Sequence, residues 1–225
     1  RVIQLGECPN RVFNVGGLGI DNINKLKLLN KDDFEKSIDF NLGEKNILVT
    51  FHPVTLEAST SKNQFQELLN SISELKDTKI IFTKANSDTD GRIINSMVDD
   101  YTAKHINTIA FASMGQLNYL SALQFVDAVV GNSSSGLLET PSFKIGTIDI
   151  GDRQKGRIKA DSVISCLPDK KNIDNALKKI YSRHFQEIVK NVKNPYGKGG
   201  ASKIILDIIK DFNLDNIIKK TFYDL

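Results

Sequence analysis

The residues best suited to chemistry form the run Gly131-Asn132-Ser133-Ser134-Ser135-Gly136-Leu137-Leu138-Glu139, which follows a short apolar segment and opens a predicted helix. A strand, a small polar turn and a helix in this order direct free backbone N–H groups at one point, where phosphate binds. The serine hydroxyls add donors, and Glu139 has oxygens that accept hydrogen bonds from two sugar hydroxyls. The run predicts a nucleotide site. The alternative interpretation is a serine-rich N-cap that binds nothing.

Strands and helices alternate through the middle of the chain in the predicted pattern. Apolar runs predict strands at 46–51, 79–83, 105–112, 127–131 and 145–150, and a brief sixth at 162–166. Helices are predicted at 61–76, 91–101 and 116–125, with mostly helical structure from 173 onward, interrupted at 194–197. Such alternation is typical of right-handed βαβ units. The predicted fold class is α/β, with a Rossmann-like parallel sheet and flanking helices.

Polar motifs follow the predicted strands at their carboxyl ends. The first strand is followed by His52-Pro53, the second by Asn86 and Asp88, the third by Ser113-Met114-Gly115 and the fifth by 151–157. The serine-rich run follows the fourth. In an open parallel sheet, ligands bind in the crevice outside these ends. We therefore expect a histidine, phosphate donors, an acid and two arginines suited to oxyanions to meet at one mouth.

Length and composition are those of an ordinary soluble globular protein. A chain of 225 residues, 40% hydrophobic and 25% charged, is long enough for one large α/β domain or two small ones. Its charge of +3 comes from interspersed residues, which gives little support for nucleic-acid binding. No apolar run reaches the roughly 20 residues of a membrane helix. Cys8 and Cys166 lie far apart in no zinc-binding spacing, which predicts a reducing, cytoplasmic setting.

Three motifs together resemble those of the hydrolysing UDP-N-acetylglucosamine 2-epimerases of sialic-acid-type biosynthesis. They are His52-Pro53-Val54-Thr55, the run from Gly131 to Glu139, and Gly151-Asp152-Arg153-Gln154-x-Gly156-Arg157. The resemblance covers almost the whole chain, including Asn194-Pro195-Tyr196-Gly197. Non-hydrolysing sister enzymes usually carry His-Arg-x-Glu-Asn in place of the first motif and Thr-Glu-Arg-Pro-Glu near the third. Neither occurs here, so the hydrolysing branch is favoured.

The resemblance implies one half of a glycosyltransferase-B-type fold, in which a UDP-sugar lies between two Rossmann-like halves. Residues 1–22 would be a hinge segment after a missing amino-terminal domain, and 23–192 the Rossmann-like UDP-binding domain. Residues 193–225 would form carboxyl-terminal helices that pack back on the missing domain. The glycines at 16, 17 and 19 fit a hinge turn better than a dinucleotide loop, since the GxGxxG spacing is incomplete.

The implied reaction converts UDP-N-acetylglucosamine and water to N-acetylmannosamine and UDP. Anti elimination of UDP gives a glycal, to which water then adds in the syn sense. His52 is the implied catalytic residue and would contact the diphosphate. The resemblance places the carboxylates that move the C2 proton on the amino-terminal half, and this chain offers no convergent pair to replace them. We expect the isolated chain to bind UDP with little or no turnover, and to need no cofactor and no metal.

The remaining implied roles concern the nucleotide. Ser133 and Ser134 would cradle the diphosphate, Glu139 would bind both ribose hydroxyls, Arg153 would add positive charge at the phosphates, and the backbone around Met114 would pair with uracil. Asn86, Asp88 and Arg157 would line the same mouth.

Alternatives stay open at this point. One is a 2-epimerase of the same family for UDP-2,4-diacetamido-6-deoxy sugars, another is a glycosyltransferase half, and a third is a non-catalytic nucleotide-sugar binding module. The expected partners are UDP and a UDP-amino sugar, with neither nucleic acid nor a membrane. The full-length protein is expected to be a homo-oligomer.

Two positions depart from the family pattern. Gly146 stands where relatives usually have proline, and Asp149 where asparagine is usual. A carboxylate at the end of the fifth strand would oppose an anionic ligand, so we expect Asp149 to pair with Arg153 or Arg157. Tyr119 is predicted to belong to core packing rather than to stack on uracil.

Overall fold

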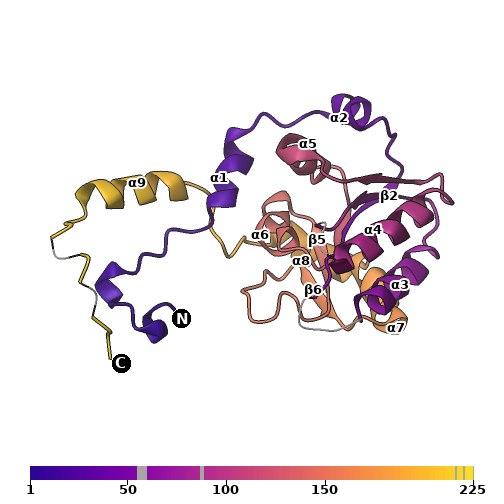
Figure 1. The fold of residues 1–225 in the computed structure, drawn as a ribbon. Coiled ribbons are helices and arrows are strands. Elements are labelled where there is room, and N and C mark those ends of the chain that lie inside the picture. Colours follow the sequence, from indigo (N-terminus) through magenta and orange to yellow (C-terminus); the bar gives the residue numbers. More distant parts are fainter. Residues whose placement is uncertain (55–59, 87–88, 216, 220, 225) are drawn as a thin grey trace. The chain divides into compact units, whose positions relative to one another are not determined.

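The computed structural model describes residues 1–54, 60–86, 89–215, 217–219 and 221–224, so the predicted Asp88 lies outside the described residues. Its strands are β1 (Lys45–Thr50), β2 (Thr78–Thr83), β3 (Thr108–Phe111), β4 (Ala128–Gly131), β5 (Gly146–Ile150) and β6 (Val163–Cys166). Its α-helices are α1 (Leu18–Lys25), α2 (Lys31–Ile38), α3 (Ser61–Ile72), α4 (Thr89–Thr102), α5 (Gly115–Ala122), α6 (Ser135–Leu138), α7 (Lys170–Ile180), α8 (Arg183–Asn191) and α9 (Ala201–Asp211) (Figure 1).

The strands form one parallel sheet in the order β3-β2-β1-β4-β5-β6. The predicted α/β fold with a Rossmann-like sheet is therefore confirmed. The chain builds outward from β1 to β3 and then returns to place β4 on the other side of β1. The loops that follow β1 and β4 therefore run toward opposite edges of the sheet. The crevice between these two loops, at the carboxyl ends of the strands, is where such sheets bind ligands.

Helices cover both faces of the sheet. On one face, a single apolar cluster joins strand residues such as Val49 and Ile148 to Phe65 of α3, Ile94 of α4 and Ile173 of α7. On the other face lie α5 and α6, with α2 packed against α5 (Figure 1). These two layers of helices leave the carboxyl ends of the strands free to carry the loops of a site.

Helix α2 is absent from the sequence prediction. Its segment carries only two buried apolar residues, Phe34 and Ile38, in a strongly charged stretch. The amphipathic signal is therefore short, although Asn30 provides an ordinary N-cap by accepting a hydrogen bond from the Asp33 N–H at 2.9 Å. Phe34 becomes fully buried against Phe125, with ring centroids 5.7 Å apart. Tertiary packing stabilises a helix that local sequence marks weakly.

A polar cluster closes the amino edge of the sheet. Asp127 Oδ2 accepts hydrogen bonds from the Asn46 N–H at 2.8 Å and from the Tyr181 hydroxyl at 3.4 Å. The Lys45 ammonium lies 5.4 Å from the centre of the Tyr181 ring. These contacts tie β1 and the segment before β4 to the end of α7, at the edge opposite the crevice.

The chain divides into two compact units, one made of residues 1–25 with 196–225 and the other of residues 26–195. The sheet belongs to the second unit. In the first unit, α1 and α9 are joined because Asp21 caps α9. Its Oδ1 accepts hydrogen bonds from Gly200 N at 2.6 Å and Ala201 N at 3.1 Å, and its Oδ2 from Ser202 N at 2.8 Å. Within the described residues, no helix is both long and apolar enough to span a membrane.

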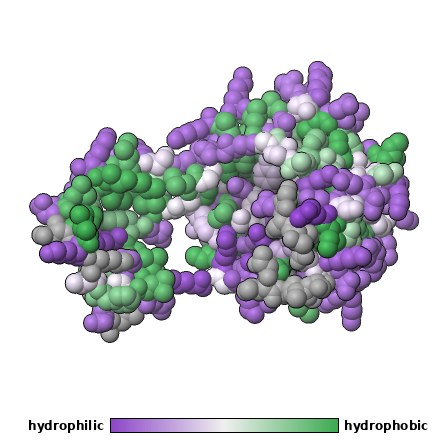
Figure 2. Space-filling view, viewed as in Figure 1, coloured by the Kyte–Doolittle hydropathy of each residue, from purple (hydrophilic) through white to green (hydrophobic). Residues whose placement is uncertain are grey.

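The surface of the first unit is rich in apolar side chains. Figure 2 shows them gathered over α9, and the exposed ones of this unit include Leu5, Leu206, Ile209, Ile218 and Phe222. Exposed apolar side chains gathered on one surface are typical of an interaction site.

Asp21 should make the stability of the first unit depend on acid pH. Hydrogen bonds from Ser202, Gly200 and Ala201 lower the pKa of Asp21 from 3.8 to about 2. A lowered pKa means that the cap stabilises the fold fully above pH 4 and loses this effect as the pH falls through 2. We expect Asp21→Asn to unfold at a lower temperature than the unchanged protein at pH 5. The difference in unfolding temperature should vanish near pH 2. Thermal unfolding followed by circular dichroism measures it, and a difference that is the same at pH 5 and pH 2 would contradict the prediction.

Candidate functional site

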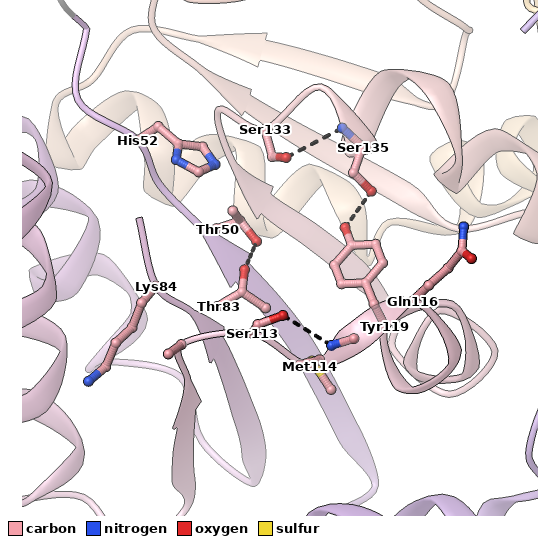
Figure 3. A pocket seen from close by; sticks show the side chains of 12 residues that line it. Thr50, His52, Thr83, Lys84, Ser113, Met114, Gln116, Tyr119, Ser133 and Ser135 are labelled. Carbon is pink, nitrogen blue, oxygen red and sulfur yellow. Dashed lines mark hydrogen bonds between the residues drawn. The ribbon is translucent and has the colours of Figure 1, made fainter. Parts of the chain in front are cut away.

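A pocket of about 350 Å³ opens at the carboxyl ends of the first four strands, where the strand order reverses. Four loops and helix α5 supply its lining, as Figure 3 shows. The lining residues are Thr50, His52, Thr83, Lys84, Ala112, Ser113, Met114, Gly115, Gln116, Tyr119, Ser133 and Ser135. The pocket therefore lies at the place that the sheet topology favours for a ligand.

Gly131 allows β4 to end close against β1. Its φ is +135°, and a Cβ built on it would lie 1.9 Å from the carbonyl oxygen of Thr50. The next residue, Asn132, donates its backbone N–H to the same oxygen at 3.1 Å. The close approach requires glycine, and it starts the serine turn, which we define as Ser133 to Ser135, directly beside the end of β1.

The donors of the serine turn are its own amides and hydroxyls. Helix α6 spans only four residues, so a helix dipole contributes little at this turn. In the part of the chain that the structure describes, the backbone N–H groups of Ser133 and Ser134 donate to no acceptor. The Ser133 hydroxyl accepts from the Ser135 N–H at 3.4 Å and faces the pocket. An anion would satisfy these donors.

Tyr119 belongs to the pocket and not to the core alone, which corrects the prediction made from its helical position. Its phenol points from α5 to the serine turn and forms a hydrogen bond with the Ser135 hydroxyl (Figure 3). Burial raises the pKa of Tyr119, and the charge of the nearby Glu139 raises it further. The tyrosine therefore stays neutral and holds one serine hydroxyl in place.

Glu139 lies beside this pair at the end of α6. It is half-buried, and no hydrogen bond to its carboxylate occurs among the residues that the structure describes. A carboxylate this close to the anion donors, with its acceptor capacity unused, is suited to accept from hydroxyl groups of a ligand. Glu139 does not itself line the pocket, so it contacts a ligand only at the pocket edge.

Several lining residues were not predicted from the sequence. Thr50 and Thr83, the last residues of β1 and β2, share a hydrogen bond between their hydroxyls at the pocket floor. Lys84 is the next residue after Thr83, and its Nζ lies 2.5 Å from Asp99 Oδ1. The available signal was positional, since each lies at or directly after the end of a strand, at the edge where other motifs were assigned. Gln116, on the first turn of α5, carried no such signal.

The loop after β5 lies behind the serine turn. Arg153 Nη1 and Gln154 Nε2 both donate to the carbonyl oxygen of Asn132, at 3.1 and 2.8 Å. Partial burial lowers the pKa of Arg153, and the nearby Arg157 lowers it further. Both arginine residues still expose much of their surface, and neither lines the pocket, although Arg153 reaches the turn that does.

The pocket thus brings together three of the predicted site residues, His52, Met114 and Ser133. Ser134, Glu139 and Arg153 lie in or against the serine turn without lining the pocket. Asn86 is exposed and also does not line the pocket.

Asp149 pairs with Lys159, so the predicted pairing with Arg153 or Arg157 was wrong. Lys159 Nζ lies 2.7 Å from Asp149 Oδ2 and also 2.7 Å from the Ser165 hydroxyl. Asp149 is 1% exposed, and burial raises its pKa while Lys159 opposes that rise. The path of the loop after β5 determines which basic side chain lies next to Asp149. Distance along the sequence does not reveal that path.

Removing the lysine should leave a buried carboxylate without its partner. We expect Lys159→Met to lower the free energy of unfolding by about 2 kcal/mol, less than for a fully buried pair because water reaches the lysine. Adding Asp149→Asn should restore most of this loss, because a neutral amide needs no counter-charge. Urea unfolding of both variants tests the prediction, and equal losses in the single and double variants would contradict it.

The described residues contain no group of three or more histidine, cysteine, aspartate or glutamate side chains that could hold a metal ion. The described lining of the pocket includes one histidine, one lysine, several hydroxyls and no carboxylate. These groups can bind an anion through hydrogen bonds and positive charge.

Comparison with known proteins identifies the family. The family model described as UDP-N-acetylglucosamine 2-epimerase matches residues 1–210. The chain is 40% identical over 227 residues to the GDP/UDP-N,N'-diacetylbacillosamine 2-epimerase (hydrolyzing) of Campylobacter jejuni, and 40% identical over 227 residues to polysialic acid biosynthesis protein P7 of Escherichia coli. Each match covers 100% of this chain, and respectively 59% and 58% of the relative. The chain thus spans about three fifths of the length of these relatives.

A solved structure of similar fold is also found. The solved structure of S. aureus MnaA with UDP matches 100% of this chain and 60% of its own, with a TM-score of 0.74 and 19% identity. At that identity the likeness concerns the fold alone. The family is shown by the match of the family model to residues 1–210 and by the 40% identity to the bacterial relatives. This chain belongs to the UDP-N-acetylglucosamine 2-epimerase family.

Proposed function

We propose that the complete protein is a hydrolysing UDP-N-acetylglucosamine 2-epimerase and that this chain supplies the half that holds UDP. The observation that carries the proposal is the pocket at the reversal of strand order, with the unused N–H groups of Ser133 and Ser134 on one wall. The unused carboxylate of Glu139 lies one turn away. Diphosphate donors followed at this distance by an acceptor for hydroxyls match the order of groups in a nucleoside diphosphate.

Roles for the individual residues follow from this placement. The diphosphate would contact Ser133, Ser134 and His52, with Arg153 adding positive charge from behind the turn. Glu139 would accept from the two ribose hydroxyls. Uracil would lie at Met114, the N-cap of α5, whose carbonyl belongs to the first helical turn, so its N–H is the group left for the base. Asn86 and Arg157, which do not line the pocket, would approach only its rim, and Asp88 stays a proposed lining residue of the site.

In the proposed reaction a base removes the proton from C2 of the sugar while the bond from C1 to the diphosphate oxygen breaks. The bonding electrons leave with UDP, and a glycal remains. Water then returns a proton to C2 and a hydroxyl to C1, with inversion at C2. This half would stabilise the charge that develops on the diphosphate, and such stabilisation is often the main source of an enzyme's rate enhancement.

The proton transfers at C2 would belong to another part of the protein. The described pocket lining contains no carboxylate, Asp149 is held by Lys159, and Glu139 would be occupied by ribose. We therefore propose the organisation of 1–22 as hinge, 23–192 as UDP-binding domain and 193–225 as a segment that packs on an amino-terminal domain. The exposed apolar side chains of the first unit support this packing. We further propose a cytoplasmic homo-oligomer that binds neither nucleic acid nor membrane.

A second candidate substrate is supported by the names of relatives. The Campylobacter jejuni relative is named for GDP/UDP-N,N'-diacetylbacillosamine, a 2,4-diacetamido sugar. The elimination would be the same, since the groups at C4 and C6 take no part in it. The chain alone would not distinguish the two sugars, because they would be contacted mainly by the other half.

The test is the reaction of the complete gene product in deuterium oxide. UDP-N-acetylglucosamine and the UDP-linked and GDP-linked diacetamido sugars are supplied in turn, and the sugar product is examined by NMR. A hydrolysing epimerase gives free nucleoside diphosphate and a product that carries deuterium at C2. Release of UDP without deuterium at C2 would instead indicate a glycosyltransferase or simple hydrolase. Binding of UDP without any release would indicate a non-catalytic binding module.

A further inference from the structure

Asn132 makes a pair of hydrogen bonds that the sheet itself cannot provide. The ladder between β1 and β4 ends at Thr50 and Gly131. Beyond it, the Asn132 side chain accepts from the His52 backbone N–H at 2.7 Å and donates from Nδ2 to the His52 carbonyl oxygen, also at 2.7 Å. A side-chain amide carries the same donor and acceptor as a peptide group. It therefore adds one further rung to the ladder, and this rung holds the backbone of His52.

The backbone of Asn132 is itself fixed on two sides. Its N–H donates to Thr50, and its carbonyl accepts from both Arg153 and Gln154. The residue is 1% exposed, so water does not compete for these bonds. His52 is thus held by a residue whose own position is determined by β1 and by the loop after β5.

From these contacts we infer that Asn132 is a positioning residue that fixes His52 against the serine turn. The inference rests on the proposed function for its catalytic meaning, since His52 and Ser133 would contact the same diphosphate from two sides of the pocket (Figure 3). Ser133 is the next residue in the chain, so one residue sets the distance between the two groups. Misplacement by about 1 Å costs roughly 100-fold in rate in well-studied enzymes, so such a residue matters for turnover.

Asparagine is the residue type that this position requires. Aspartate would keep the acceptor for the His52 N–H, but its second oxygen would face the His52 carbonyl oxygen, and two acceptors repel. Alanine would remove both of these bonds to the His52 backbone. Because Arg153 and Gln154 bind the backbone carbonyl of Asn132, either substitution leaves their contacts in place.

A matched control lies on β1, the strand that His52 follows. Asn46, at the amino end of β1, is 5% exposed, accepts from Gly43 N at 2.8 Å and donates to Gly43 O at 3.1 Å. It is a buried amide that bridges an N–H and a C=O of one residue, as Asn132 does, far along β1 from the pocket, and its Nδ2 also donates to Phe125 O at 3.3 Å. Asn46→Ala therefore reports what such an amide contributes to stability alone.

The experiment compares Asn132→Ala, Asn132→Asp and Asn46→Ala in the complete gene product. We expect both Asn132 variants to lower kcat for UDP release at least tenfold with KM changed by less than about threefold. Asn46→Ala should lower the unfolding temperature comparably and leave kcat within twofold. In a His52→Ala background, adding Asn132→Ala should cost less than twofold further. If the losses in kcat from His52→Ala and Asn132→Ala multiply in the double variant, the inference is wrong. An Asn132 variant that is destabilised but fully active would also overturn it.

A second readout does not depend on activity. The chain has three histidines, and NMR of the imidazole C–H signals separates them. In either Asn132 variant the His52 signals should move while those of His105 and His184 stay, and unmoved His52 signals would contradict the inference. If the unchanged protein released no nucleoside diphosphate from any sugar nucleotide, the proposed function would fail, and the NMR result would still decide whether Asn132 positions His52.

Discussion

Gly131→Ala is expected to lower the free energy of unfolding by about 3 kcal/mol or more, because a methyl group has no room between β4 and β1. The new Cβ would lie 1.9 Å from Thr50 O and 2.7 Å from Thr50 C, both of them backbone atoms that cannot rotate away. The φ of +135° adds strain for any residue with a side chain. For a chain of this length the unfolding temperature should fall by about 6–12 °C, measured by calorimetry.

Gly151→Ala is the matched control for this prediction. Gly151 directly follows the neighbouring strand β5 and also has a positive φ, +75°, but no atom lies within 4 Å of the position that an alanine Cβ would occupy. Alanine there should cost only the conformational preference, about 1 kcal/mol. Equal losses at the two positions would show that backbone conformation, and not the approach of β4 to β1, determines the need for glycine.

Glu139→Ala is expected to weaken UDP binding by at least about 100-fold. A hydrogen bond to a charged group contributes about 1.5–3 kcal/mol, and each 1.4 kcal/mol is a factor of about ten in affinity, so loss of two such bonds gives an effect of this size. The carboxylate makes no hydrogen bond within the described chain, so its removal should leave the unfolding temperature nearly unchanged. Isothermal titration with UDP measures the affinity.

The ligand provides the control for this second prediction. If Glu139 binds the ribose, unchanged protein should prefer UDP over 2'-deoxy-UDP, and the Glu139→Ala variant should bind the two equally. Glu187→Ala, which removes an exposed carboxylate paired with Lys190, should alter neither affinity. A preference for UDP that persists in Glu139→Ala would assign the ribose contact to another residue.

The sheet was the part of the structure most open to prediction from sequence. Parallel strands buried on both faces read as short apolar runs, and those at 46–51 and 145–150 agree with β1 and β5 within a residue at each end. The edge strand β3 is shorter than the predicted 105–112, because residues before Thr108 form a turn in which the Thr108 N–H donates to His105 O. Apolar character alone does not show where pairing with β2 begins.

The site was predicted as a set of loops rather than as a set of contacts. His52, Met114 and Ser133 follow strands, so the sheet topology places them at one edge. The partners of Asp149 and Tyr119 depend on how a loop returns to the sheet and how α5 is rotated, and neither is encoded in local spacing. The role of Asn132 was hidden for the same reason, since an asparagine after a strand ordinarily indicates a turn.

The polar cluster of Asp127, Tyr181 and Lys45 has a consequence for how this protein can adapt. It lies at the edge of the sheet opposite the pocket, so substitutions there change resistance to heat without touching a group that faces a ligand. Selection for growth temperature and selection for substrate can then act on separate edges of one sheet. Substitutions that raise heat tolerance are therefore best sought at this amino edge, where a gain in stability need not be traded against ligand binding.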